Sequence, residues 1–106
     1  MFVRNVAVHL KPNSLTEFTK IFEGEVLPIL QKQPGFQDEI TFSTSPSGTD
    51  VIAISLWDTK PHAESYNATG YPEVLKCLNS VLDGAPRVRV SDVISSTLHK
   101  TAAIAA

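Results

Sequence analysis

The order of strand-like and helix-like segments is the feature that most limits how this chain can fold. Alternating or valine-rich apolar runs at residues 2–11, 36–44, 51–57 and 86–97 are typical of β-strands. One helical pattern separates the first two runs, and another separates the last two. This β-α-β-β-α-β order predicts an α+β, ferredoxin-like antiparallel sheet. Right-handed crossovers then place the first and third strands side by side in the middle.

The first helical segment is predicted over residues 14–33, with a proline inside it. Ser14 and Glu17 have the spacing of a capping box, in which each side chain bonds a free backbone N–H. Pro28 has no N–H to donate, and its ring presses on the carbonyl four residues earlier, at Gly24. We therefore expect a helix that is kinked or broken near Gly24.

The second helical segment begins after Thr59, a typical N-cap residue, and is interrupted by Gly70. Residues 1–98 are predicted to form a single domain, which agrees with a chain of 106 residues. The remaining residues, 99–106, are predicted to be a C-terminal tail with little to pack against.

Composition narrows the class of protein. The formal net charge is −2 and there is no basic stripe, so a nucleic-acid partner is not expected. No apolar run approaches the ~18 residues of a membrane span, and the N-terminus lacks a signal-peptide pattern. The single cysteine, Cys77, is interpreted as a small buried hydrophobe, and a cytoplasmic location is expected. His9, His62 and His99 have no zinc-ligand spacing, so neither a metal nor a cofactor is predicted.

Both central strands are apolar on both faces, although two helices can cover only one face of a four-stranded sheet. Such a face exposes on the order of 400 Å², which is more than a monomer usually leaves in water. Covering it contributes on the order of 10 kcal/mol per subunit before association costs. We therefore expect a homodimer whose two sheets pack face to face.

Alternation along the central strands predicts a ligand pocket. Ser55 and Trp57 share one face of the third strand, and Asn5 and His9 share one face of the first. We expect these two faces to coincide, because a surface of small and polar residues leaves room for a cavity. The kinked first helix is expected to form its lid. The predicted substrate-pocket residues are His9, Phe18, Phe22, Ser55 and His62.

The same residues have structural explanations that are weighed beside the functional ones. Trp57 at a strand end is commonly a core anchor. Asn5 can simply bond the backbone, and His62 in a first helical turn can be solvated. Tyr66 can pack with its hydroxyl in water.

Four features of the chain occur together: the element order, the "QPGF" link into the second strand, the strand-end Trp57 with an acid after it, and a helix before the last strand. In these features the chain resembles the antibiotic biosynthesis monooxygenase (ABM) superfamily. The resemblance extends over residues 2–97. It implies a dimeric α+β barrel. Some members are cofactor-free monooxygenases of quinols or polycyclic aromatics, and others degrade haem.

The haem-degrading branch uses an asparagine on the first strand, the tryptophan that ends the third, and a histidine on the following helix. Asn5 and Trp57 match the first two. The matching helical turn holds Tyr66 and Asn67, and His62 lies one turn too early. Because the helix has no histidine at the matching turn to bind the haem iron, we predict that haem is not a substrate.

The residues and the resemblance together predict a cofactor-independent, monooxygenase-like protein acting on a small aromatic or quinol. The predicted catalytic residues are Asn5, Trp57 and Tyr66. Asn5 orients an oxygen of the substrate and Trp57 forms the pocket wall. Either Tyr66 or His9 transfers the proton. The other reading is a non-catalytic, small-molecule-binding dimeric barrel protein, and an isomerase or decarboxylase on a related barrel is a third. The predicted partners are a second copy of the chain and a small aromatic ligand, with no nucleic acid and no membrane.

Overall fold

The computed structural model describes residues 1–97, and its elements follow the predicted order. The predicted tail, residues 99–106 with His99, lies outside the described residues. The strands are β1 (Phe2–His9), β2 (Phe36–Ser43), β3 (Asp50–Trp57) and β4 (Arg87–Asp92). The helical segments are α1 (Leu15–Ile21), η1 (Phe22–Val26), α2 (Leu27–Gln31), α3 (Lys60–Ala68) and α4 (Gly70–Leu78).

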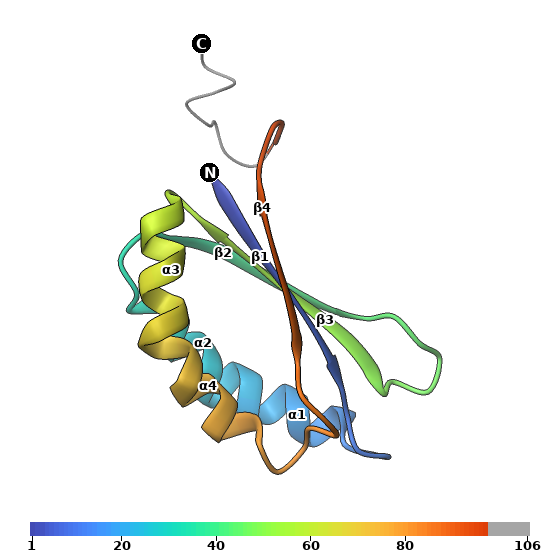
Figure 1. Cartoon of the computed structure of the whole chain (residues 1–106). Coiled ribbons are helices and arrows are strands. Elements are labelled where there is room, and N and C mark those ends of the chain that lie inside the picture. The colour runs from blue at the N-terminus through green and yellow to red at the C-terminus, as the bar shows by residue number, and fades with distance from the viewer. Residues whose placement is uncertain (98–106) are drawn as a thin grey trace.

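The predicted ferredoxin-like sheet is confirmed. Its strands are ordered β2-β3-β1-β4, and every neighbouring pair is antiparallel, so β1 and β3 lie in the middle. The helical segments form an arc along one face, and the opposite face carries no helix from the described residues (Figure 1). Buried apolar side chains fill the space between this helix-facing side and the helices. The core consists of Phe2, Leu10, Phe18, Phe22, Val26, Leu30, Val51, Trp57, Ala63, Tyr66, Val74, Leu78 and Val81.

The register between β1 and β3 decides which side chains share a face. Phe2 lies opposite Trp57, and Arg4 lies opposite Ser55. Directly opposite residues of an antiparallel pair project to the same side of the sheet. The even-numbered residues of β1 therefore join the odd-numbered residues of β3 on the helix-facing side. This choice buries Phe2 and, just beyond β1, Leu10, which is fully inaccessible to solvent.

The first helical segment is broken where the sequence predicted it. Between α1 and α2, the segment η1 is a π-helix with Gly24 at its centre. The N–H of Leu27 donates to the carbonyl of Phe22, five residues earlier, instead of four. Pro28 follows directly and has no N–H to offer Gly24. The wide turn thus accommodates the proline, and it lets Phe18 and Phe22 both face the sheet as buried residues.

Several local predictions need correction. Ser14 precedes α1 but its hydroxyl makes no capping bond, so the capping box does not form. Its backbone carbonyl still accepts from the N–H of Phe18. The α2 helix ends at Gln31, two residues before the predicted end. β4 ends at Asp92 because its partner β1 begins at Phe2, opposite Asp92. The N–H of Val93 still donates to the carbonyl of Met1, and residues 94–97 have no strand to pair with.

The start of α3 is fixed as predicted by Thr59, whose hydroxyl accepts from the N–H of His62. The loop before β2 reaches the same point, since the carbonyl of Gly35 accepts from the N–H of Asp58. Gly35 has a positive φ of 80°, and a Cβ there would overlap Asp58 and His62. Only glycine fits this contact between the "QPGF" loop and α3. The predicted interruption of the second helical segment is present, one residue earlier: Thr69 lies between α3 and α4, and Gly70 begins α4. Within residues 1–97, no helix has both the length and the apolar character needed to cross a membrane.

Two glycines should respond oppositely to alanine. Gly24→Ala should raise the free energy of unfolding by about 0.5–1 kcal/mol, because the site is helical and exposed and a Cβ there meets nothing. Gly35→Ala should lower it by about 1–3 kcal/mol, because the backbone is left-handed and the space is filled. Urea unfolding measures both. Equal effects of the same sign would contradict this account of the two glycines.

Candidate functional site

A small apolar cavity lies between the helix-facing side of the sheet and the helices. Its volume is about 40 Å³. This is room for a few water molecules and less than the roughly 150 Å³ that holds a benzene ring. An aromatic ligand therefore enters only if side chains around the cavity move. The sheet contributes Arg4, Val6, Val8, Glu39, Ala53 and Ser55, and the helices contribute Phe18, Phe22, Val26, Leu30, Tyr66, Tyr71, Val74, Leu75 and Leu78.

A tryptophan and a tyrosine build one wall of this cavity. The Trp57 and Tyr66 rings stack with their centroids 4.8 Å apart and an angle of 27° between planes. Such a pair contributes roughly 0.5–1.5 kcal/mol beyond the burial of its area. The indole Nε1–H of Trp57 donates to the Ser55 hydroxyl at 2.9 Å. Because that bond uses Ser55 as acceptor, the Ser55 hydroxyl still has its own hydrogen to donate.

Arg4 is the most unusual residue of the cavity, since it is charged and only 3 % exposed. Its guanidinium carbon lies 5.2 Å from the ring centre of Tyr66 and 4.7 Å from that of Tyr71. One nitrogen, Nη1, donates to the side-chain oxygen of Asn67 at 2.9 Å. The other two nitrogens, Nε and Nη2, are buried with no hydrogen-bond acceptor. The two ring faces thus compensate only part of the hydration energy that the guanidinium loses on folding.

The charge of Arg4 has no carboxylate partner within salt-bridge distance among residues 1–97. Burial lowers the pKa of its guanidinium, and the two nearby tyrosines offset this in part. The same burial raises the pKa of Tyr66 far above that of a free phenol. Burial also raises the pKa of Tyr71. Both tyrosines are therefore hydroxyl donors at neutral pH and poor bases.

Glu39 is the acidic group of the cavity. In the sheet it lies opposite Ser55 on β2, as Arg4 lies opposite Ser55 on β1. With neighbouring strands ~4.8 Å apart, the two charged residues start about 10 Å apart on either side of Ser55. Burial raises the pKa of Glu39, and a hydrogen bond from the Thr41 hydroxyl opposes the shift. A carboxyl group with a raised pKa beside a cavity is suited to accept or return a proton.

A wider groove adjoins the cavity on the side of β2. Its volume is about 570 Å³, and Phe18, Phe22 and Glu39 line both spaces. The two phenylalanine rings contact each other at 5.5 Å between centroids. They separate groove from cavity, and both lie beside the broken turn of η1. Glu39 lies at the boundary between the two spaces. That the first helix acts as a lid stays a prediction.

Several of the predicted site residues lie together. Phe18, Phe22, Ser55 and Tyr66 line the cavity. Trp57 is completely buried directly behind Tyr66 and shapes the wall without lining the space. The predicted stretch from the end of β3 into α3 therefore both anchors the helix and forms the pocket. Whether these residues are catalytic stays a prediction.

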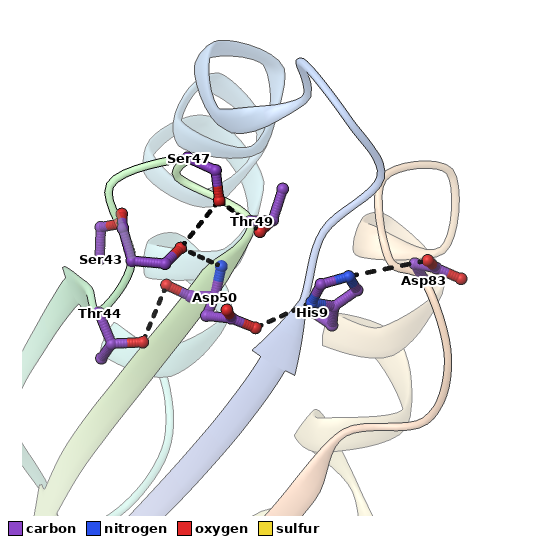
Figure 2. A network of polar contacts seen from close by, with 8 residues as sticks. His9, Ser43, Thr44, Ser47, Thr49, Asp50 and Asp83 are labelled. Carbon is purple, nitrogen blue, oxygen red and sulfur yellow. Dashed lines mark hydrogen bonds and ion pairs between the residues drawn. The ribbon is translucent and has the colours of Figure 1, made fainter.

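Asn5 and His9 lie elsewhere, and the prediction that they share a face with Ser55 and Trp57 is wrong. Asn5 lies opposite Ile54, on the side of the sheet that carries no helix. His9 is exposed at the end of β1, where its Nδ1 lies 2.8 Å from Asp50 and its Nε2 lies 3.9 Å from Asp83 (Figure 2). It belongs to a polar network that joins the β2–β3 hairpin to the start of the loop before β4. The parity within each strand was correct, but the two strands align in the opposite way.

His62 is also outside the cavity. Its Nδ1 lies 2.7 Å from the Asp58 carboxylate, one helical turn earlier. This hydrogen bond holds the pKa of Asp58 below its usual range. Since the pair rests against Gly35, the evident role of His62 is to fix the loop before β2 onto α3. Among residues 1–97, no group of three or more histidine, cysteine, aspartate or glutamate side chains is placed to hold a metal ion.

Sequence reasoning missed Arg4, Glu39 and Tyr71. One signal for Arg4 was available, because it has the same parity as Val6, Val8 and Leu10, the apolar residues of the first strand. A cation on the apolar face of a strand indicates either a buried charge or an edge position. Glu39 gave no comparable signal, because a register shift between Phe36 and Asp38 changes the alternation of β2.

Comparison with known proteins shows the fold. A monooxygenase from the gene ActVA-Orf6 of Streptomyces coelicolor, in complex with nanaomycin D, has a TM-score of 0.75 and 20 % identity, with 93 % of this chain and 92 % of that chain covered. SnoaB, a cofactor-independent oxygenase from Streptomyces nogalater, has a TM-score of 0.67 and 18 % identity, with 92 % and 95 % covered.

Further solved structures have the same fold, and they include a protein of unknown function. A Nitrosomonas europaea protein of unknown function has a TM-score of 0.75 and 10 % identity, with 93 % of this chain and 94 % of that chain covered. Others carry the name antibiotic biosynthesis monooxygenase. No family model and no curated protein matches the sequence. The chain therefore has the fold of the antibiotic biosynthesis monooxygenases.

Replacing Arg4 tests whether its burial serves stability. Arg4→Met keeps much of the side-chain volume and removes two unpartnered donors, so the free energy of unfolding should rise or stay within about 1 kcal/mol. Leu10→Ala, at a fully buried apolar site, should lose about 2–5 kcal/mol. Urea unfolding of both variants provides the measurement. A loss for Arg4→Met as large as that for Leu10→Ala would mean that the guanidinium stabilises the fold.

Proposed function

We propose that this protein is a cofactor-independent monooxygenase that acts on a small phenolic or quinol-type aromatic. The observation that carries the proposal is the cavity between sheet and helices, which is apolar except for a few polar groups, among them the Arg4 guanidinium and the Glu39 carboxyl. The fold supports it, because the similar structures include an oxygenase whose name states that it is cofactor-independent. Fold alone does not assign chemistry, so the site residues have to carry the argument.

The chemistry relies on electrons from the substrate. An electron-rich aromatic with an acidic methylene gives a proton to Glu39, and the resulting carbanion passes one electron to O₂. The two radicals combine to a peroxide, and loss of water leaves a carbonyl. One oxygen atom enters the product, and the other leaves as water with both methylene hydrogens. The protein supplies a dry cavity, a base and donors for the developing oxyanion.

The structure changes the roles that the sequence suggested. Asn5 and His9 face away from the cavity, so neither is retained as an orienting group or a base. The raised pKa of Tyr66 makes it a hydroxyl donor, and Glu39 takes the role of base. Trp57 keeps its proposed role as the wall that fixes Tyr66. That haem is not a substrate stays a prediction.

Oxygen consumption tests this proposal. With anthrone, whose methylene is acidic, uptake should exceed autoxidation without protein. The rate should rise with pH through a pKa above the usual glutamate range, because the carboxylate form of Glu39 is the base and burial raises its pKa.

Glu39→Gln should lower the rate by at least about tenfold, or ~1.4 kcal/mol of transition-state stabilisation, and should remove that pH dependence. Glu64→Gln, at an exposed position of α3, is the matched control and should change neither. If the substrates bind but no oxygen is consumed, the alternative of a non-catalytic binding protein is correct.

The helix-free face of the sheet supports the further proposal that the working unit is a homodimer. This face carries Ile52, Ile54 and Leu56 of β3. From β2 it carries Ile40, which is 61 % exposed, and Phe42, which is 41 % exposed. Monomers rarely leave such a continuous apolar patch in water. A second copy with the same face provides a self-complementary cover with two-fold symmetry.

Light scattering at micromolar concentration tests the dimer. The protein should have the mass of two chains, and Ile54→Glu should shift it to one chain, because a charge at the centre of an apolar interface is left unpaired. Thr16→Glu, which adds the same charge on exposed α1, should remain dimeric. A monomeric unsubstituted protein would refute the proposal.

A further inference from the structure

The two unpartnered nitrogens of Arg4 have a specific geometry. Nε and Nη2 carry N–H bonds along the same edge of the planar guanidinium, whereas Nη1, which donates to Asn67, lies on the other side. Two parallel donors along one edge match the two oxygens of a carboxylate, which accepts both bonds at once. A lone carbonyl or phenolate oxygen satisfies only one of them well. The free edge of Arg4 is therefore shaped for a planar pair of oxygens.

The surroundings of Arg4 restrict the rest of such a ligand. The guanidinium provides a single positive charge, and Glu39, the acidic group of the cavity, begins two strands away. One guanidinium balances a singly charged carboxylate, but leaves a dianionic phosphate partly uncompensated in an apolar space. The cavity walls next to Arg4 are the rings of Tyr66 and Tyr71 and aliphatic side chains. These surfaces suit a flat apolar body attached to the anion.

We infer that the pocket binds an aromatic carboxylic acid as its anion, with the carboxylate held by Nε and Nη2 of Arg4. The inference deepens the proposed function, because it names the substrate class of that same site. It rests on the proposed function only in calling the ligand a substrate, since binding needs no oxygen. The bound anion gives an acceptor to each of the two donors, and neither donor has one in the unliganded protein.

Access to Arg4 requires a side chain to move, because both donors are covered in the unliganded protein. Tyr66 is held in place, 4 % exposed and stacked on Trp57. Tyr71 is only half-buried and lies in the first turn of α4, next to the break between α3 and α4. The Tyr71 ring is therefore the cover that gives way, and its displacement enlarges the cavity beside the guanidinium.

Matched ligands test the charge requirement on the unsubstituted protein. Calorimetric titration under argon compares 1-naphthoate with 1-naphthamide, which has nearly the same shape and no charge. The acid should bind at least about tenfold more tightly, a difference of ~1.4 kcal/mol. Inorganic phosphate should not compete with it. Equal affinities for acid and amide, binding of neither, or competition by phosphate would each overturn the inference.

Variants of Arg4 test whether its Nε–Nη2 edge holds the carboxylate. Arg4→Met should weaken 1-naphthoate binding by at least about tenfold and leave 1-naphthamide unchanged. Arg4→Lys keeps the charge but loses the paired donors, so its affinity should fall between the two. Lys11→Met removes a positive charge from the exposed turn after β1 and should bind as the unsubstituted protein does. If Arg4→Lys binds 1-naphthoate as well as the unsubstituted protein, charge alone suffices and the bidentate assignment is wrong.

The same variants separate this inference from the proposed function. If anthrone is oxidised equally by the unsubstituted protein and by Arg4→Met, and 1-naphthoate does not bind, the oxygenase proposal stands and the carboxylate inference fails. If 1-naphthoate binds through Arg4 and no aromatic consumes oxygen, the carboxylate site stands and the oxygenase proposal fails.

Discussion

The pairing of β1 with β3 is the constraint on which the rest of the structure depends. It places Phe2 opposite Trp57, so that two of the large side chains of the sheet enter the same core. A shift by one residue would turn Phe2 and Leu10 to the open face and bring Asn5 and His9 inside. Burying those polar residues in place of apolar ones would lose several kcal/mol. The same register carries Arg4 into the interior, although that residue gains little from being there.

The burial of Arg4 explains how the cavity is organised. Trp57 fixes the ring of Tyr66 by stacking, and Tyr66 together with Tyr71 gives the guanidinium two π faces in place of water. This compensation is incomplete, since cation–π contacts contribute about 0.5–2 kcal/mol and leave two donors without acceptors. Proteins commonly retain such a costly arrangement where a ligand completes it. The two unsatisfied donors of Arg4 are therefore the observation in the cavity that most directly motivates the proposed carboxylate site.

The positions of the two charged residues of the cavity, Arg4 and Glu39, also restrict the reaction that it can support. Arg4 and Glu39 lie on either side of Ser55, both line the cavity, and no ion pair joins them. Phe18 of α1 and Phe22, the first residue of η1, lie at the boundary with the outer groove. In the proposed complex, the ligand is held at the Arg4 end of the cavity, faces Glu39 at the other end, and is shielded from water by aromatic rings. A reaction whose electrons come from the substrate needs little more from the protein.

The sequence by itself determined the element order, the central position of β1 and β3, the break near Gly24, the interruption of the second helical segment at Gly70, and the common placement of Ser55, Trp57 and Tyr66 near one pocket. These follow from local causes: the period of apolar residues, the missing N–H of proline, and the backbone freedom of glycine. Only the tertiary structure decided that Arg4 and Glu39 enter the cavity and that Asn5 does not. Alternation fixes which residues of a strand share a face, but the register between strands depends on the packing of the whole core.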